Sequence, residues 1–120
     1  MIFLDSDILS YYFSGNEKDQ IALTIINVYE VLKGFRWRKN SKKEILFTNF
    51  LETVSVFKID NDVIKLAADI YAELRGNGKT IGDADILIAA IIIKNNGKFV
   101  TNNTEHFVNI RELTLVNWLK

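Results

Sequence analysis

Three carboxylates stand in apolar surroundings at well-separated points of the chain. Asp5 follows a short apolar run, Glu30 lies within an apolar tract, and Asp85 precedes eight consecutive apolar residues. Placing a carboxylate among apolar side chains is costly unless a counter-charge compensates for the lost hydration. The three residues therefore indicate a shared Mg²⁺ or Mn²⁺ ion, and the chemistry that such a site favours is metal-assisted hydrolysis of a phosphodiester.

Alternating strands and helices are expected to position these carboxylates. Strands are predicted at residues 2–4, at the start of the 21–34 tract, and over 54–59, 98–101 and 113–118. Helices are predicted from the first strand to about residue 13, through the 21–34 tract to an end near Gly34, and over 42–54, 63–74 and 82–95. This order predicts an α/β fold with a mostly parallel central sheet that is covered on both faces.

A parallel sheet would bring several oxygen-bearing side chains to one edge. Asp5 follows the first strand, Thr101 and Asn103 follow the strand at 98–101, and Asp85 begins an apolar helix. Sites in such sheets form at the carboxyl ends of the strands. Glu30 would then reach the same site from a neighbouring helix.

Several of these acids also have a purely structural interpretation. Asp5 or Asp7 could cap a helix, and Thr80 with Asp83 three residues later resembles a capping box. Asp83 is more simply explained in that way. Asp85 and Glu30 are not, because both are flanked by apolar residues, so together the acids favour a site.

A basic and aromatic segment follows Glu30, although the 15 basic and 15 acidic residues of the whole chain cancel. Residues 33–43 hold six basic and two aromatic side chains, a mixture suited to phosphate contact and base stacking. Arg36, Arg38 and Lys39 are the candidates for holding a nucleic acid strand. A solvated helix end is an equally open interpretation.

The composition excludes several other classes of protein. There is no cysteine, so disulfides and thiolate zinc sites are excluded. His106 has no histidine or cysteine partner and is interpreted as a loop residue, and the motifs of serine hydrolases, dinucleotide-binding proteins and P-loop NTPases are absent. With no signal-peptide pattern and no apolar run near the ~20 residues of a membrane span, a single cytoplasmic domain over residues 1–120 is expected.

Taken in order, four segments resemble the PIN-domain ribonucleases, specifically the small VapC-type toxins of toxin–antitoxin pairs. They are Phe-Leu-Asp5-Ser-Asp7-Ile-Leu, Tyr-Glu30-Val-Leu-Lys-Gly, Asp85-Ile-Leu-Ile-Ala-Ala and Val-Thr101-Asn102-Asn103-Thr-x-x-Phe107. The resemblance implies a three-layer α/β/α sandwich, an endoribonuclease that uses Mg²⁺ or Mn²⁺ and cuts single-stranded or loop RNA, often tRNA, and a homodimer inhibited by a cognate antitoxin.

The resemblance also assigns site residues. Asp5, Glu30 and Asp85 match the acidic metal positions, and Thr101 and Asn103 occupy a Thr-x-Asp/Asn position that completes or supports the site. Asp7 and Asp83 are second-tier candidates. The chain departs from the pattern at Asn103, where many relatives have a fourth carboxylate, and at His106, where relatives commonly have an acid that the adjacent Glu105 could replace.

Two other functions remain open from the sequence. Asp5-x-Asp7 after a first strand also resembles the nucleophile motif of aspartate-based phosphatases and phospho-acceptor domains, but that reading leaves Glu30 and Asp85 unexplained. The other alternative is a non-catalytic PIN-like binding module whose acidic pocket receives a basic partner.

Overall fold

A five-stranded parallel sheet forms the centre of the molecule. The computed structural model describes residues 1–12 and 21–116, with the side chains of residues 10–12 outside the description. The strands are β1 (Ile2–Leu4), β2 (Ile21–Thr24), β3 (Ser55–Phe57), β4 (Lys98–Val100) and β5 (Thr114–Val116). They lie in the order β3-β2-β1-β4-β5, and every neighbouring pair is parallel, as the sequence predicted for most of the sheet.

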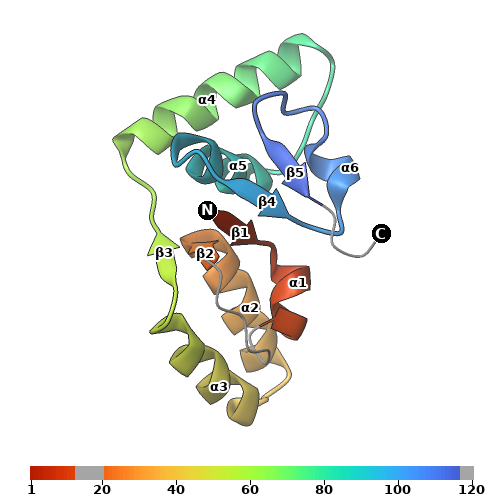
Figure 1. Cartoon of the computed structure of the whole chain (residues 1–120). Helices are drawn as coiled ribbons and strands as arrows, with labels where there is room; N and C mark the ends of the chain where they lie inside the picture. The colour runs from red at the N-terminus through yellow and green to blue at the C-terminus, as the bar shows by residue number, and fades with distance from the viewer. Residues whose placement is uncertain (13–20, 117–120) are drawn as a thin grey trace.

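Helices cover both faces of the sheet, which makes the predicted three-layer sandwich (Figure 1). One face carries α4 (Asn61–Gly76) and α5 (Asp83–Lys94), and the other carries α1 (Ser6–Tyr12), α2 (Ile25–Trp37) and α3 (Ser41–Leu51). A short helix, α6 (Thr104–Phe107), follows β4. In the part of the chain that the structure describes, none of these helices has the length and apolar character needed to cross a bilayer.

Alternating strand residues supply two separate cores. Phe3 and Phe99 face α4 and α5, whereas Leu4, Leu23 and Val100 face α1, α2 and α3. All five side chains are fully buried. Successive strand residues point to opposite faces of a sheet, so strands buried on both sides must be apolar throughout. This explains why β1 and the first three residues of β2 appear in the sequence as continuous apolar runs.

The strand register places the residues after β1 and β4 side by side. Leu4 pairs with Val100, and the Asp5 backbone N–H donates to the Val100 carbonyl at 2.9 Å. In β2, Ala22 pairs with Phe3, so the same register carried two residues further sets Thr24 opposite Asp5. The carboxyl edge of the sheet therefore joins residues that are far apart in the sequence.

The predicted end of the second helix was wrong by one turn. Helix α2 continues past Gly34 to Trp37 and closes at Lys39, which adopts a left-handed conformation with φ of 55°. The Asn40 N–H donates to the Phe35 carbonyl at 2.9 Å and completes this cap. Glycine favours such a position but is not required for it, so Gly34 misled the sequence argument.

The start of helix α5 differs from its prediction. The capping box was wrong, because α5 begins after Gly82, which has no side-chain cap, and Asp83 is its first helical residue. The predicted end of the first helix near residue 13, and the last two residues of the strand predicted over 113–118, lie outside the described residues. The remaining helices and strands agree with their predicted positions to within a few residues.

Gly97 provides a test of the packing between β1 and the turn before β4. A Cβ atom at Gly97 would lie 2.5 Å from the Cδ1 and Cε1 atoms of Phe3, whose ring is fully buried. We expect Gly97→Ala to lower the free energy of unfolding by about 1–3 kcal/mol through overpacking. The control is Gly76→Ala, where a Cβ would meet nothing within 4 Å. Equal urea midpoints for the two variants would contradict this account.

Candidate active site

Asp5 is a buried carboxylate at the carboxyl edge of the sheet. Asp5 is only 8% exposed, and both oxygens of its side chain accept hydrogen bonds. Oδ1 accepts from the Ser6 backbone N–H at 2.8 Å and from Asn27 Nδ2 at 3.0 Å, and Oδ2 accepts from Thr101 Oγ1 at 2.6 Å. All three donors are neutral, so the carboxylate is held in position without a compensating charge.

The surroundings of Asp5 disfavour its negative charge. Burial raises its pKa to about 6, the hydrogen bonds from Thr101 and Ser6 oppose this, and the nearby charges of Asp7 and Glu30 raise it further. Among the described residues, no lysine or arginine forms an ion pair with Asp5, Glu30 or Asp85. The edge of the sheet therefore gathers negative charge that a bound cation would stabilise.

Glu30 approaches Asp5 from helix α2. The Ser6 hydroxyl donates to Glu30 Oε1 at 2.7 Å, and Asn27 Nδ2 lies 3.4 Å from the same oxygen. Glu30 is one turn after Asn27 on α2, so both side chains project from the same face of the helix. Thr24 caps this helix at the end of β2, which pairs with β1, so the face that carries Asn27 and Glu30 meets Asp5 at the end of β1.

Asp85 lies in the first turn of α5, and the charge of Glu30 acts on it as it does on Asp5. Burial raises the pKa of Asp85, the His106 imidazole lowers it, and the charge of Glu30 raises it. The Nδ1 atom of His106 is 3.6 Å from Asp85 Oδ2. The sequence placed His106 in a loop, which was wrong, because it lies in helix α6 beside Asp85.

Thr101 and Asn103 behave differently from each other. Thr101 is fully buried and supports the site directly through its hydrogen bond to Asp5. Asn103 donates its backbone N–H to Thr101 Oγ1 at 3.0 Å, but its side chain is exposed and makes no hydrogen bond to a described residue. In this structure Asn103 steadies Thr101 through its backbone, and its amide does not join the carboxylates.

The second-tier acids also separate into two groups. Asp7 lies next to the site, where its Oδ2 accepts from the Asn102 N–H at 3.2 Å and where burial raises its pKa. Asp83 and Glu105 are both exposed. It is His106, and not Glu105, that faces Asp85.

The sequence argument missed three residues of this cluster, namely Ser6, Thr24 and Asn27. Asn27 is fully buried and contacts Asp5, Ser6 and Glu30, and Thr24 Oγ1 donates to Asn27 Oδ1 at 2.8 Å. The signal was present in the sequence, because Thr24, Asn27 and Glu30 are the polar residues of the 21–32 tract and recur every third position. That spacing places Asn27 and Glu30 on one helical face.

Two cavities adjoin the carboxylates. One, of about 160 Å³, extends from Ser6 and Glu30 toward the end of α2 and is lined by Ser6, Glu30, Val31, Gly34, Phe35 and Arg38. The other, of about 210 Å³, lies beside Asp85 and His106 and is also lined by Thr80, Ile81 and Gly82. One cavity thus adjoins Glu30 and the other adjoins Asp85.

The predicted basic residues are placed unequally around the first cavity. Arg38 lines it, and its Nη2 atom would be 3.1 Å from a Cβ at Gly34, so the missing side chain of Gly34 leaves the guanidinium room to fold back along the helix. Arg36 points elsewhere and forms an exposed ion pair with Glu44 at 2.9 Å. Lys39 closes helix α2.

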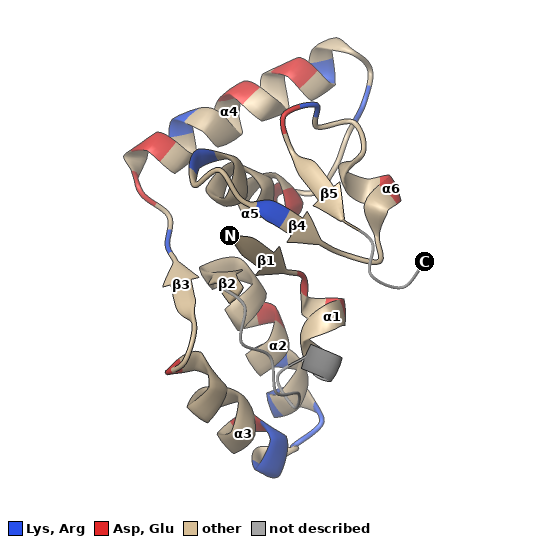
Figure 2. Cartoon of the chain, in the orientation of Figure 1, with Lys and Arg blue, Asp and Glu red and all other residues tan. Residues whose placement is uncertain are grey.

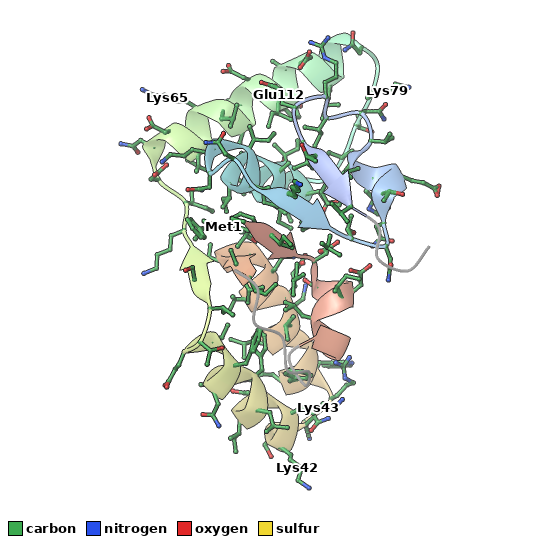
Figure 3. The ribbon with its side chains drawn as sticks, viewed as in Figure 1. Met1, Lys42, Lys43, Lys65, Lys79 and Glu112 are labelled. Atoms are coloured by element: carbon green, nitrogen blue, oxygen red, sulfur yellow. The ribbon has the colours of Figure 1, made fainter. Side chains whose placement is uncertain are left out.

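The remaining basic residues of the segment gather at one end of the molecule. Figure 2 shows acidic residues on α1, α2 and α5 around the carboxyl edge, and basic residues where α2 meets α3. Lys42 and Lys43 reach away from the body at this end (Figure 3). The basic segment thus adjoins the acidic site at Arg38, and its lysines at the start of α3 lie farther from the site.

The donor set fits a hard divalent cation. Mg²⁺ and Mn²⁺ bind oxygen ligands, and Mg²⁺ usually keeps several waters beside one or two carboxylates. Within residues 1–9 and 21–116, no three acidic or imidazole side chains are already grouped closely enough to enclose one ion. A cation at this edge would therefore be held by few protein ligands, which leaves positions for water and substrate.

The chain is similar to known proteins over nearly its whole length. The PIN domain family model matches residues 2–113. The chain is 30% identical over 117 residues to Ribonuclease VapC1 of Methanocaldococcus jannaschii, covering 95% of this chain and 84% of that protein. It is 29% identical over 105 residues to Ribonuclease VapC2 of Rickettsia felis, covering 87% of this chain and 78% of that protein.

Solved structures share the same fold. The structure of VapBC2 from Rickettsia felis bound to a DNA fragment from their promoter matches with a TM-score of 0.85 and 26% identity, over 98% of this chain and 99% of that chain. The parallel sheet and the acidic residues at its carboxyl edge indicate the same family as these matches, which cover nearly the whole chain. The chain belongs to the PIN domain family, among the VapC-type proteins.

Proposed function

We propose that this protein is a metal-dependent endoribonuclease and the toxin of a toxin–antitoxin pair. The observation that supports the proposal is that the charge of Glu30 acts on both Asp5 and Asp85 in a PIN-domain fold, with no lysine or arginine among the described residues paired to these acids. Its relatives in Methanocaldococcus jannaschii and Rickettsia felis are named ribonucleases.

Asp5, Glu30 and Asp85 would hold Mg²⁺ or Mn²⁺, and Asn103 could join them only by turning its exposed side chain inward. When bound, such an ion supplies a water of lowered pKa and stabilises negative charge on the phosphoryl oxygens. Thr101, Ser6 and Asn27 keep the oxygens of Asp5 and Glu30 oriented before the ion arrives. Arg38, in the adjoining cavity, would bind a phosphate next to the one that is cut.

The proposed substrate is single-stranded or loop RNA, with tRNA as the first candidate. The two cavities beside the acids would receive parts of an RNA strand, and proteins recognise RNA mainly where its bases are unpaired. The cytoplasm is the proposed location, because the proposed RNA substrate is found there. The similarity to VapBC2 supports a cognate antitoxin as partner, and a homodimer is proposed from the family resemblance.

The geometry disfavours the phosphatase alternative. An aspartyl nucleophile at Asp5 leaves Glu30 and Asp85 without a role, although the charge of Glu30 acts on both Asp5 and Asp85. A phospho-acceptor domain would also have a lysine at the end of a strand near Asp5. Lys98 is instead the first residue of β4 and lies at the opposite end of the strands from Asp5. The non-catalytic alternative differs from the nuclease in needing no metal, and the following experiments distinguish the two.

Asp85→Asn is expected to abolish RNA cleavage without unfolding the protein. The substitution removes one negative charge from the metal site but preserves the shape of the side chain, so we expect the rate to fall ~100-fold or more. The assay is cleavage of a total tRNA pool with Mn²⁺ or Mg²⁺, compared with EDTA. Asp69→Asn, an exposed acid on α4, is the control. Cleavage by Asp85→Asn at the parental rate would refute the assignment.

Asp5→Asn is expected to stabilise the metal-free protein and to remove its response to metal. The neutral amide ends the repulsion from Asp7 and Glu30 and can donate to Thr101 Oγ1, so we expect a gain of about 1–3 kcal/mol in EDTA.

With Mn²⁺ at ~100 times its dissociation constant, the wild type should gain about 2.7 kcal/mol, whereas Asp5→Asn should gain nothing. Urea unfolding with and without Mn²⁺ measures both effects. Equal stabilisation of the two proteins by Mn²⁺ would contradict a role for Asp5 in binding the ion.

Arg38→Gln is expected to weaken RNA binding by removing one phosphate contact. The slope of log Kd against log salt concentration should fall by ~0.7, the value for one phosphate of a single strand. Fluorescence anisotropy of a labelled single-stranded RNA in EDTA measures this slope. Arg36→Gln should change it less, because Glu44 already pairs with Arg36. Arg75→Gln on α4 is the control, and an identical slope for Arg38→Gln and Arg75→Gln would exclude the contact.

A further inference from the structure

We propose that Asn27 is the positioning residue of the active site, whose side-chain amide sets the carboxylates of Asp5 and Glu30 for cation binding. The inference rests on the proposed function, because the cation is the one invoked there. Asn27 is not itself expected to contact the substrate or the ion. It acts through Asp5 directly and through Ser6 on Glu30.

The amide of Asn27 is the centre of a hydrogen-bond network at the carboxyl edge. Its Nδ2 donates to Asp5 Oδ1 at 3.0 Å and to Ser6 Oγ at 3.0 Å, and it lies 3.4 Å from Glu30 Oε1. The Ser6 hydroxyl in turn donates to Glu30 Oε1 at 2.7 Å. One neutral group therefore connects two carboxylates that repel each other, and Ser6 relays the connection to Glu30.

The orientation of the amide is fixed from behind by Thr24. The Thr24 hydroxyl donates to Asn27 Oδ1 at 2.8 Å, which leaves only the Nδ2 end of the amide to face the carboxylates. Both residues are fully buried, so water cannot replace either bond. An amide turned the other way would direct its oxygen at Asp5 and lose both sets of bonds.

Helix formation does not require this amide. Thr24 caps α2 by accepting the backbone N–H of Asn27 at 3.1 Å, and any residue at position 27 other than proline provides that N–H. An apolar side chain of similar size could fill the space. The buried amide is thus explained by the carboxylates it orients and not by the helix it belongs to.

Removing such a supporting hydrogen bond usually weakens metal binding or activity 10- to 100-fold. We therefore expect Asn27→Leu to raise the Mn²⁺ dissociation constant ~10-fold or more and to lower kcat with little change in KM. Mn²⁺ binding is measured by the electron paramagnetic resonance signal of the free ion, and folding by thermal melting in EDTA. A lower melting temperature with parental Mn²⁺ affinity and kcat would show a structural role and overturn the inference.

Two further substitutions keep the test decisive if Asn27→Leu does not fold. Ser6→Ala removes the relay to Glu30 but retains the Ser6 backbone bond to Asp5, so it should also weaken Mn²⁺ binding. Thr24→Ser retains the hydroxyl that orients the amide and should keep the parental Mn²⁺ affinity, whereas Thr24→Val should lose it. Parental affinity in both Ser6→Ala and Thr24→Val would overturn the inference.

A metal-free measurement separates this inference from the proposed function. The side-chain amide resonances of Asn27 should shift in Asp5→Asn and in Ser6→Ala but not in Asp69→Asn, whether or not the protein binds Mn²⁺ or cuts RNA. Wild-type protein that neither binds Mn²⁺ nor cuts RNA, with the Asn27 resonances shifted as expected, would refute the proposed function and the cation but not the hydrogen-bond network. Unshifted Asn27 resonances in both site variants would refute the network and with it the positioning role.

Discussion

The burial of the Asp5 carboxylate is the constraint on which the rest of the site depends. A charge in that position must be hydrogen-bonded, and the bonds come from Ser6, Asn27 and Thr101, which follow or flank different strands. These partners reach Asp5 only because β1 pairs in parallel with both β2 and β4. The register of the sheet therefore determines the geometry of the acidic cluster. A shifted register would separate Asp5 from its hydrogen-bond partners.

Neutral hydrogen-bond donors hold the carboxylates of the cluster in position, and the carboxylates keep their negative charge. Amide and hydroxyl groups hold Asp5 and Glu30 without cancelling their charge, so the protein retains an attraction for cations at some cost in its own stability. Salt bridges with lysine or arginine would have relieved the repulsion but would also have competed with a metal ion. His106 near Asp85 is the exception within the described residues, and it stands at the outer side of the site with its side chain 62% exposed.

Three basic residues of the 33–43 segment have different surroundings in the structure. Arg36 is occupied by Glu44, and Lys39 closes helix α2, whereas Arg38 lies along the helix over Gly34 toward the acidic site. A basic segment that looks uniform in the sequence thus contains one residue at the cavity, one in an ion pair and one at a helix end. The difference arises from where the helix ends, which the sequence pattern misjudged.

By itself, the sequence determined the α/β architecture and the order of nearly all helices and strands, and it singled out Asp5, Glu30 and Asp85 as candidates, because apolar periodicity and isolated acids in apolar tracts are local signals. Only the tertiary structure decided which polar residues meet. Asn27 and Ser6 joined the cluster, the side chain of Asn103 turned away from it, and His106 moved beside Asp85. These outcomes depend on strand register and helix ends, where a shift of one residue reverses the direction of a side chain and no local pattern records the choice.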